Sequence, residues 1–277
     1  MKTRIVKAGK VSFGGNLPFV LIAGPCVIES RAATIKMAGD LVKLTKRLGI
    51  PYVFKASYDK ANRTSSDSFR GPGLADGLDV LREVKERFGV PVVSDVHEVG
   101  QVEAVASVLD IIQIPAFLCR QTDLVLEVAR TRRVVNIKKG QFLAPWDVKS
   151  IVRKVESTGN RKLLLTERGV TFGYNNLVTD FKAFQIMRET GYPVVYDVTH
   201  SVQQPGGLGH ATGGQSEFIQ LLSRCGVAAG VDAIFMETHT NPKKALSDGP
   251  NMIAINRLEP LLEVLLKIDG TVKKVLG

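Results

Sequence analysis

The stretch of sequence that decides the fold is IIQIPAFLCRQTDLVLEVARTRRVVNIK, residues 111–138. It has short apolar runs at residues 111–114 and 134–137, separated by a helix candidate at residues 123–130. Continuous apolar runs of this length are typical of strands that are buried on both faces of a parallel sheet. The stretch is therefore predicted to be one strand–helix–strand unit.

Outward from this unit, the same alternation continues along the chain. Apolar runs predict strands at residues 19–22, 52–54, 91–93, 111–114, 134–137, 163–165, 194–196 and 233–236. The other segments predict helices at residues 32–48, 74–88, 99–108, 123–130, 147–156, 176–189, 215–229 and 253–268. Eight strands alternating with eight helices predict an α/β fold, a closed (β/α)8 TIM barrel. An open doubly wound sheet is the alternative, but Gly24-Pro25-Cys26 is not its Gly-rich fingerprint.

The length of the chain agrees with one domain. A (β/α)8 barrel typically has about 250 residues, and the chain has 277. Hydrophobic residues make up 44% and charged residues 23%, which is typical of a globular protein and argues against a disordered one. We expect residues 1–277 to form a single barrel domain, with residues 1–14 as a β-hairpin outside the barrel at its lower end.

Membrane insertion and export are not expected. The longest apolar stretch, residues 18–28, is interrupted by Gly24 and Pro25 and is shorter than the roughly 18 residues of a membrane span. Three cysteines, Cys26, Cys119 and Cys225, contain no Cys-x-x-Cys pair, which fits a reducing compartment. We expect a cytoplasmic protein.

Polar and charged residues follow the predicted strands, where a barrel enzyme places its active site. These residues are Cys26, Lys55, Lys60, Arg63, Asp95, His97, Gln113, Arg120, Lys138, Arg168, Asp197, His200, Glu237 and Asp248. Six of them are cations from strands two, four, five and six: Lys55, Lys60, Arg63, Arg120, Lys138 and Arg168. Lysine and arginine hold phosphate through charge-assisted hydrogen bonds, so two phosphates, or a phosphate and a carboxylate, would balance this set.

A second group follows strands one, seven and eight, which are neighbours only in a closed barrel. Cys26, His200, Glu237 and Asp248 offer a thiolate, an imidazole and two carboxylates. Mixed sulfur, nitrogen and oxygen donors suit a divalent metal such as zinc, iron(II), manganese or cobalt. Taken one at a time, a buried cysteine or a hydrogen-bonded histidine is an equally ordinary interpretation.

Several motifs resemble one enzyme family, the 3-deoxy-D-manno-octulosonate 8-phosphate synthases, over residues 18 to 265. The matching segments are IAGPCVIES (22–30), FKAS (54–57), DKANR (59–63), QIPAFLCR (113–120), NIKKGQF (136–142), TERG (166–169), FGYNN (172–176), DVTHS (197–201), METH (236–239) and ALSDGP (245–250). The resemblance implies a (β/α)8 barrel, usually tetrameric. It also implies condensation of phosphoenolpyruvate with D-arabinose 5-phosphate, releasing phosphate and supplying a sugar for lipopolysaccharide.

The resemblance also implies roles for individual residues. Phosphoenolpyruvate would be held by Lys60, Arg120, Lys138 and Arg168. The phosphate of arabinose 5-phosphate would be held by Asn62, Arg63 and Thr64, the last of which replaces a serine of the family. Asp95 would contact the sugar hydroxyls, and Lys55, His97 and Gln113 would belong to the same site. Cys26 stands where a metal-independent branch of the family has asparagine, which implies the metal-dependent branch.

Two other functions compete with this interpretation. A related synthase uses erythrose 4-phosphate instead, but it is expected to carry Lys-Pro-Arg-Thr where residues 60–64 read Lys-Ala-Asn-Arg-Thr. The net charge of +10 raises the possibility of nucleic-acid binding, which the 6% aromatic content and the lack of a recognisable binding module weaken. The partners expected are the two small-molecule substrates and further copies of the chain, with neither nucleic acid nor a membrane.

Overall fold

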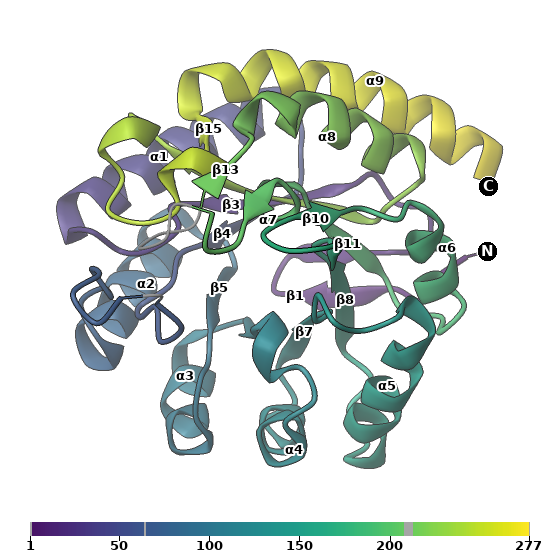
Figure 1. Ribbon diagram of the computed structural model, residues 1–277, viewed down its shortest axis with the longest axis horizontal. Helices are drawn as coiled ribbons and strands as arrows, with labels where there is room; N and C mark the ends of the chain where they lie inside the picture. Colours follow the sequence, from purple (N-terminus) through teal and green to yellow (C-terminus); the bar gives the residue numbers. More distant parts are fainter. Residues whose placement is uncertain (1, 64, 208–212, 277) are drawn as a thin grey trace.

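The computed structural model describes residues 2–63, 65–207 and 213–276, and its central feature is a closed ring of parallel strands (Figure 1). The barrel strands are β3 (Val20–Gly24), β4 (Tyr52–Lys55), β5 (Val92–Asp95), β6 (Ile111–Ile114), β7 (Val134–Lys138), β8 (Leu163–Glu167), β11 (Val194–Asp197) and β14 (Ala233–His239). Each pairs in parallel with the next, and β14 pairs with both β11 and β3. The predicted (β/α)8 barrel is therefore confirmed.

Most barrel strands extend further than their apolar runs. β4 ends on Lys55, β5 on Asp95, β7 on Lys138 and β11 on Asp197, all buried. The parallel ladder continues through these residues, since Lys138 is still in register with Thr166 on β8. These four polar side chains are therefore positioned by the sheet rather than by loops.

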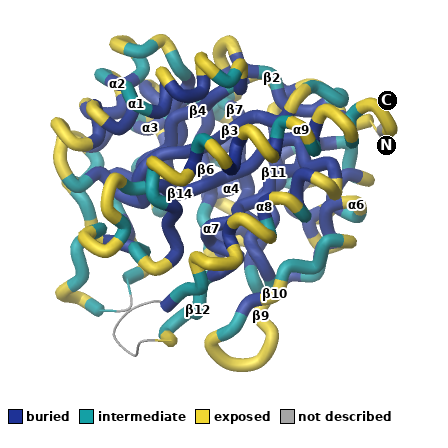
Figure 2. Tube along the Cα trace, turned by 90° about the horizontal axis from the view of Figure 1, so that it is seen from above, coloured by how far each residue is buried: buried dark blue, intermediate teal, exposed yellow. Residues whose placement is uncertain are grey.

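Helices surround the barrel strands, which are almost entirely buried (Figures 1 and 2). They are α1 (Arg31–Leu48), α2 (Leu74–Phe88), α3 (Val102–Val108), α4 (Thr122–Arg130), α5 (Val148–Ser157), α6 (Lys182–Arg188), α7 (Val198–Ser201), α8 (Ile219–Ala228) and α9 (Leu258–Leu276). The ends of α1 follow from its sequence: Ser30 Oγ accepts a hydrogen bond from the amide of Ala33 at 3.2 Å, and Gly49 ends the helix with φ 68°. No helix in the described ranges is long and apolar enough to cross a membrane.

Two of the predicted helices are preceded by a short strand. The segment predicted as helix 176–189 first forms β10 (Leu177–Val178), which pairs with β9 (Val170–Thr171), and α6 starts only at Lys182. The segment predicted as helix 253–268 first forms β15 (Ile253–Ala254), which pairs with the end of β14. In both segments the first residues pair with a neighbouring strand, although the spacing of their apolar side chains also fits a helix.

The N-terminal hairpin consists of β1 (Val6–Ala8) and β2 (Val11–Phe13), paired antiparallel. Its apolar side chains join one buried cluster with residues from every barrel strand, among them Val20, Val53 and Leu164. Phe13 has no exposed surface. The expected hairpin at residues 1–14 is confirmed, and it closes the barrel at the end opposite the carboxyl ends of the strands. A second short pair, β12 (Gln203–Gln204) and β13 (Gly213–Gly214), lies at that carboxyl end.

Candidate active site

A cavity of about 1480 Å³ lies at the carboxyl ends of the barrel strands. Eleven of the residues predicted from the sequence line it: Lys55, Lys60, Asn62, Arg63, Asp95, His97, Lys138, Arg168, His200, Glu237 and Asp248. Cys26 is buried and bonded to Asp248 at its edge. Gln113 is buried below it, hydrogen-bonded to Asp95. The barrel thus brings together side chains that are more than 200 residues apart in the chain.

Two predicted residues are not placed in this cavity. Arg120 is exposed and lines a separate pocket of about 300 Å³ with Asp147 and Lys154. It follows a 3-10 turn, Ala116–Leu118, that carries the chain from β6 to α4. Thr64 lies outside the described residues. The roles of both residues stay predictions.

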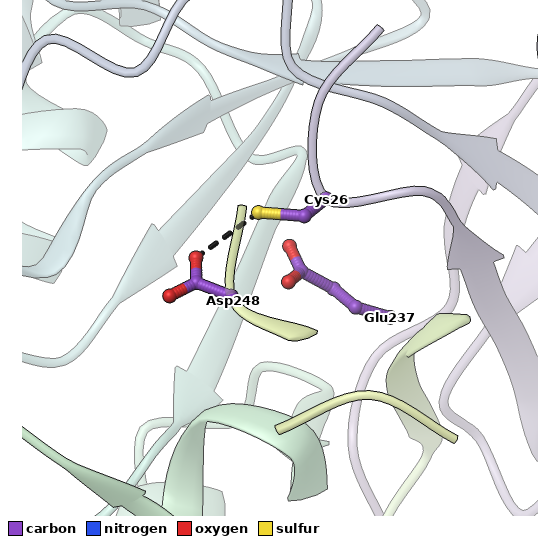
Figure 3. Close-up of side chains that lie close together, drawn as sticks. All are labelled: Cys26, Glu237 and Asp248. Atoms are coloured by element: carbon purple, nitrogen blue, oxygen red, sulfur yellow. Dashed lines mark hydrogen bonds between the residues drawn. The ribbon is translucent and has the colours of Figure 1, made fainter. Parts of the chain in front are cut away.

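Three potential metal ligands converge at one side of the cavity (Figure 3). Cys26 follows β3, Glu237 belongs to β14, and Asp248 lies in the loop after it; their donor atoms are within 4.8 Å of one another. Cys26 Sγ donates to Asp248 Oδ2 at 3.0 Å. The fourth predicted ligand, His200, places Nε2 3.6 Å from Glu237 Oε2.

The donor atoms of this cluster fit a cation. Glu237 Oε2 is buried and has no hydrogen-bond partner in the described part of the chain, which is costly for a carboxylate oxygen. Burial alone would raise the pKa of the Glu237 carboxyl. Lys55 and His200 lower it by a larger amount, so its pKa is low and the group is ionised. Burial and the charge of Glu237 raise the pKa of the Cys26 thiol. A bound cation would instead lower the pKa of the Cys26 thiol, because a coordinating thiol loses its proton.

Asp197 orients His200 from below. Its Oδ2 lies 2.7 Å from His200 Nδ1 and 2.5 Å from Lys138 Nζ, and its Oδ1 accepts the His200 amide at 3.0 Å. The imidazole therefore keeps Nε2 directed at Glu237, which is the arrangement that a metal-ligating histidine needs. Burial opposes ionisation of Asp197, yet His200 and Lys138 hold its pKa well below the usual range.

Two lysines lie beside the potential metal ligands. Lys55 Nζ donates to the Cys26 carbonyl at 2.8 Å and to Glu237. Lys60 Nζ lies 3.8 Å from Glu237 and 3.9 Å from Asp95. Burial alone would lower the pKa of Lys60. Nearby negative charges, those of Glu237 and Asp95 among them, raise it by a larger amount, so the ammonium stays charged. Close approach of β3 and β4 requires Gly24, where a Cβ would lie 1.9 Å from the Lys55 carbonyl oxygen.

The cavity is built for anions. Seven lysine and arginine side chains line it against three carboxylates. Among the described residues, Arg168 Nη1 and Arg63 Nη2 are buried without a hydrogen-bond partner. The remaining bonds of these guanidinium groups hold them in place, from Arg168 to Gln203 and from Arg63 Nε to the Phe69 carbonyl at 2.9 Å. Each arginine therefore lines the cavity with one guanidinium nitrogen left without a partner among the described residues.

Sequence reasoning missed the uncharged members of the site. Ser57, Asn136, Thr166, Gln203 and Ser247 each hydrogen-bond to a residue of the site or to a side chain that does. They lie on a barrel strand or in the segment that follows one. An uncharged polar side chain is ordinary at such a position, so it does not stand out as a charged group, a cysteine or a histidine does.

Comparisons with known proteins agree with this architecture. The family model described as the DAHP synthetase I family matches residues 2–274. A 2-dehydro-3-deoxyphosphooctonate aldolase of Geotalea daltonii is 59% identical, covering 97% of this chain and 98% of its own. Proteins with the same name from Geobacter sulfurreducens and Pelobacter propionicus are 59% and 58% identical, each covering 98% of this chain and 100% of its own. The chain belongs to the DAHP synthetase I family.

Proposed function

We propose that the chain catalyses the reaction of a 2-dehydro-3-deoxyphosphooctonate aldolase. Phosphoenolpyruvate, D-arabinose 5-phosphate and water would give 3-deoxy-D-manno-octulosonate 8-phosphate and inorganic phosphate, for lipopolysaccharide synthesis. The name shared by relatives that match the chain over nearly its full length supports this assignment. The chain would be a transferase.

The observation that carries the proposal is the pair of free guanidinium donors, Arg63 Nη2 and Arg168 Nη1, in one cavity. Two phosphorylated substrates need two anion sites in the same cavity, and their mutual repulsion must be offset for them to meet. The excess of cations over carboxylates supplies that compensation.

The roles of the residues follow from this arrangement. Lys60, Lys138 and Arg168 would hold the phosphate and carboxylate of phosphoenolpyruvate. Asn62 and Arg63 would hold the sugar phosphate, and Asp95 would accept hydrogen bonds from sugar hydroxyls. Carbon 3 of phosphoenolpyruvate then attacks the aldehyde, water adds at carbon 2, and the carbon–oxygen bond to phosphate breaks. The ammonium and guanidinium groups would stabilise the departing phosphate.

We further propose that Cys26, His200, Glu237 and Asp248 hold one divalent metal ion, as in the metal-dependent branch. Two observations support this: Glu237 Oε2 has no hydrogen-bond partner among the described residues, and ligand atoms of Cys26, Glu237 and Asp248 lie within 4.8 Å of one another. When bound, such an ion orients or polarises the aldehyde or the attacking water. Zinc, iron(II), manganese and cobalt all suit these donors.

One assay tests both proposals. The protein is incubated with phosphoenolpyruvate and either arabinose 5-phosphate or erythrose 4-phosphate, and released phosphate is measured with and without chelator. We expect phosphate release with arabinose 5-phosphate and none with erythrose 4-phosphate. Phosphate release with erythrose 4-phosphate and not with arabinose 5-phosphate would reassign the substrate. Full activity after chelation would contradict the metal proposal.

The assembly and location are also proposals. Large aromatic side chains are exposed in the loops after β6, β7 and β8: Phe117, Phe142, Trp146, Phe172 and Tyr174. Exposed apolar groups gathered in this way mark interaction surfaces, which supports a homo-oligomer, a tetramer by family resemblance. Light scattering in solution would give four times 30.1 kDa for a tetramer; a monomer mass would contradict it. We place this single-domain chain in the cytoplasm.

A further inference from the structure

A chain of hydrogen-bonded side chains crosses four neighbouring strands beneath the cavity. It links Asp95 on β5, Gln113 on β6, Asn136 on β7 and Thr166 on β8, all of them buried. Asp95, Gln113 and Asn136 are direct partners in the strand register. Thr166 lies two residues beyond the partner of Asn136, Leu164. The sheet therefore holds the four side chains in a row.

The links of the chain run in one direction. Thr166 Oγ1 donates to Asn136 Oδ1 at 2.6 Å, and Asn136 Nδ2 donates to Gln113 Oε1 at 2.9 Å. Gln113 Nε2 donates to Asp95 Oδ1. On its other oxygen, Asp95 accepts from Ser57 Oγ at 2.8 Å. The oxygen and the nitrogen of both side-chain amides, Gln113 and Asn136, are therefore hydrogen-bonded.

The charge of Asp95 dictates that direction. An ionised carboxylate can only accept, so Gln113 must present its NH2 group to Asp95 and its oxygen to Asn136. Asn136 must then present its NH2 group to Gln113, which leaves its oxygen for the hydroxyl of Thr166. Burial opposes ionisation, but Lys60 and Lys55 hold the pKa of Asp95 well below its usual range. Reversing the Gln113 amide would break both of its links, and reversing Asn136 would break its link to Gln113.

We propose that Asn136 and Thr166 are positioning residues for Asp95, acting through Gln113. They fix the rotamer of a carboxylate that lines the cavity and leave its remaining lone pairs directed at the sugar hydroxyls. This inference rests on the proposed function, since it assigns the chain to recognition of arabinose 5-phosphate rather than phosphoenolpyruvate. Neither residue lines the cavity itself.

Two nearly isosteric variants test the chain. Thr166→Val removes the terminal donor, and we expect the KM for arabinose 5-phosphate to rise about two- to tenfold, the cost of one neutral hydrogen bond. Asn136→Asp puts a carboxylate at this position, and a carboxylate can only accept hydrogen bonds. The single NH2 group of Gln113 then cannot serve both this carboxylate and Asp95. A link to a charged group is lost, and the expected rise is about ten- to a hundredfold. In both variants the KM for phosphoenolpyruvate should stay within about twofold of the wild type, an effect too small to count as a lost hydrogen bond.

A matched control separates positioning from folding. Thr45→Val deletes another buried threonine hydroxyl, one that donates to carbonyls within α1 and does not line the cavity. Thermal unfolding should shift similarly in Thr45→Val and Thr166→Val, whereas only Thr166→Val should change the KM for the sugar phosphate. Should Asn136→Asp fail to fold, Thr166→Val decides the question alone.

The failures can be told apart. Absence of phosphate release by the wild type from the two substrates overturns the proposed function and this inference with it. With an active wild type, an unchanged KM for arabinose 5-phosphate in Thr166→Val overturns the inference alone. An equal rise in both KM values does the same, because it would show a general distortion of the barrel.

Discussion

Replacing Asp197 with asparagine is the most informative single change to the site. The variant keeps the size of the side chain but removes a charge that faces Lys138 Nζ at 2.5 Å and His200 Nδ1 at 2.7 Å. Lys138 and Asp197 are both buried. Breaking a buried ion pair by removing one partner costs about 3–5 kcal/mol, because the remaining charge loses its compensation.

The measured quantity is the thermal midpoint of the metal-free protein. For a chain of this size each kcal/mol corresponds to about 2–4 °C, so Asp197→Asn should unfold about 6–20 °C below the wild type. Its affinity for Zn²⁺ or Co²⁺, measured by equilibrium dialysis, should fall about 10–100-fold, because His200 loses the acceptor that orients it.

The control is Asp40→Asn, which removes an exposed carboxylate 2.7 Å from Lys36 Nζ on the same helix. Exposed pairs of this kind contribute about 0.3–0.5 kcal/mol, so its midpoint should hardly move. If Asp197→Asn matches Asp40→Asn in both thermal midpoint and metal affinity, then Asp197 neither compensates the charge of Lys138 nor orients His200.

Three further predictions concern pH, the N-terminal hairpin and the thiol. Burial raises the pKa of Glu167, so the folded state binds this proton more tightly than the unfolded state, and the contribution of this group to stability should fall as pH rises above about 4.3. In urea unfolding at several pH values, the stability of the wild type should therefore decline relative to that of Glu167→Gln as pH rises; a difference that stays constant would contradict this. Phe13→Ala should cost about 3–5 kcal/mol in urea unfolding, whereas Ile5→Ala, at a half-exposed position, should cost far less; equal losses would mean that the hairpin does not seal the barrel. Cys26→Ala should bind metal poorly and be inactive while Cys26→Asn keeps some turnover, with Cys225→Ala as the control for thiol loss; metal binding by Cys26→Ala equal to that of Cys225→Ala would remove the thiol from the site.

Much of the fold could be predicted because the information is local. Each barrel strand is a short apolar run whose length and surroundings distinguish it from a helix, and the strand ends then locate the cavity. The late starts of α6 and α9 could not be predicted, because residues 177–178 and 253–254 pair with segments that only the folded chain brings alongside.

The site was predictable where it carries charge. Lys55, Asp95 and Glu237 are conspicuous within apolar runs, since burying them is costly unless they are paired. Asn136 and Thr166 are not conspicuous, because an uncharged polar residue in a strand is ordinary, and only the register across β5 to β8 makes these two part of a row. The outward position of Arg120 depends on the turn after β6, whose direction the local sequence does not specify.

The pairing of β14 with β3 has a consequence for how the protein is made. During synthesis the segment that carries Cys26 leaves the ribosome more than 200 residues ahead of Glu237 and Asp248. The cations on β4 and β7 can be in place before then, but three of the four proposed metal donors, His200 included, follow them along the chain. A chain released before β14 is made would lack the strand that closes the ring, so the proposed metal could be bound only after that strand has been translated.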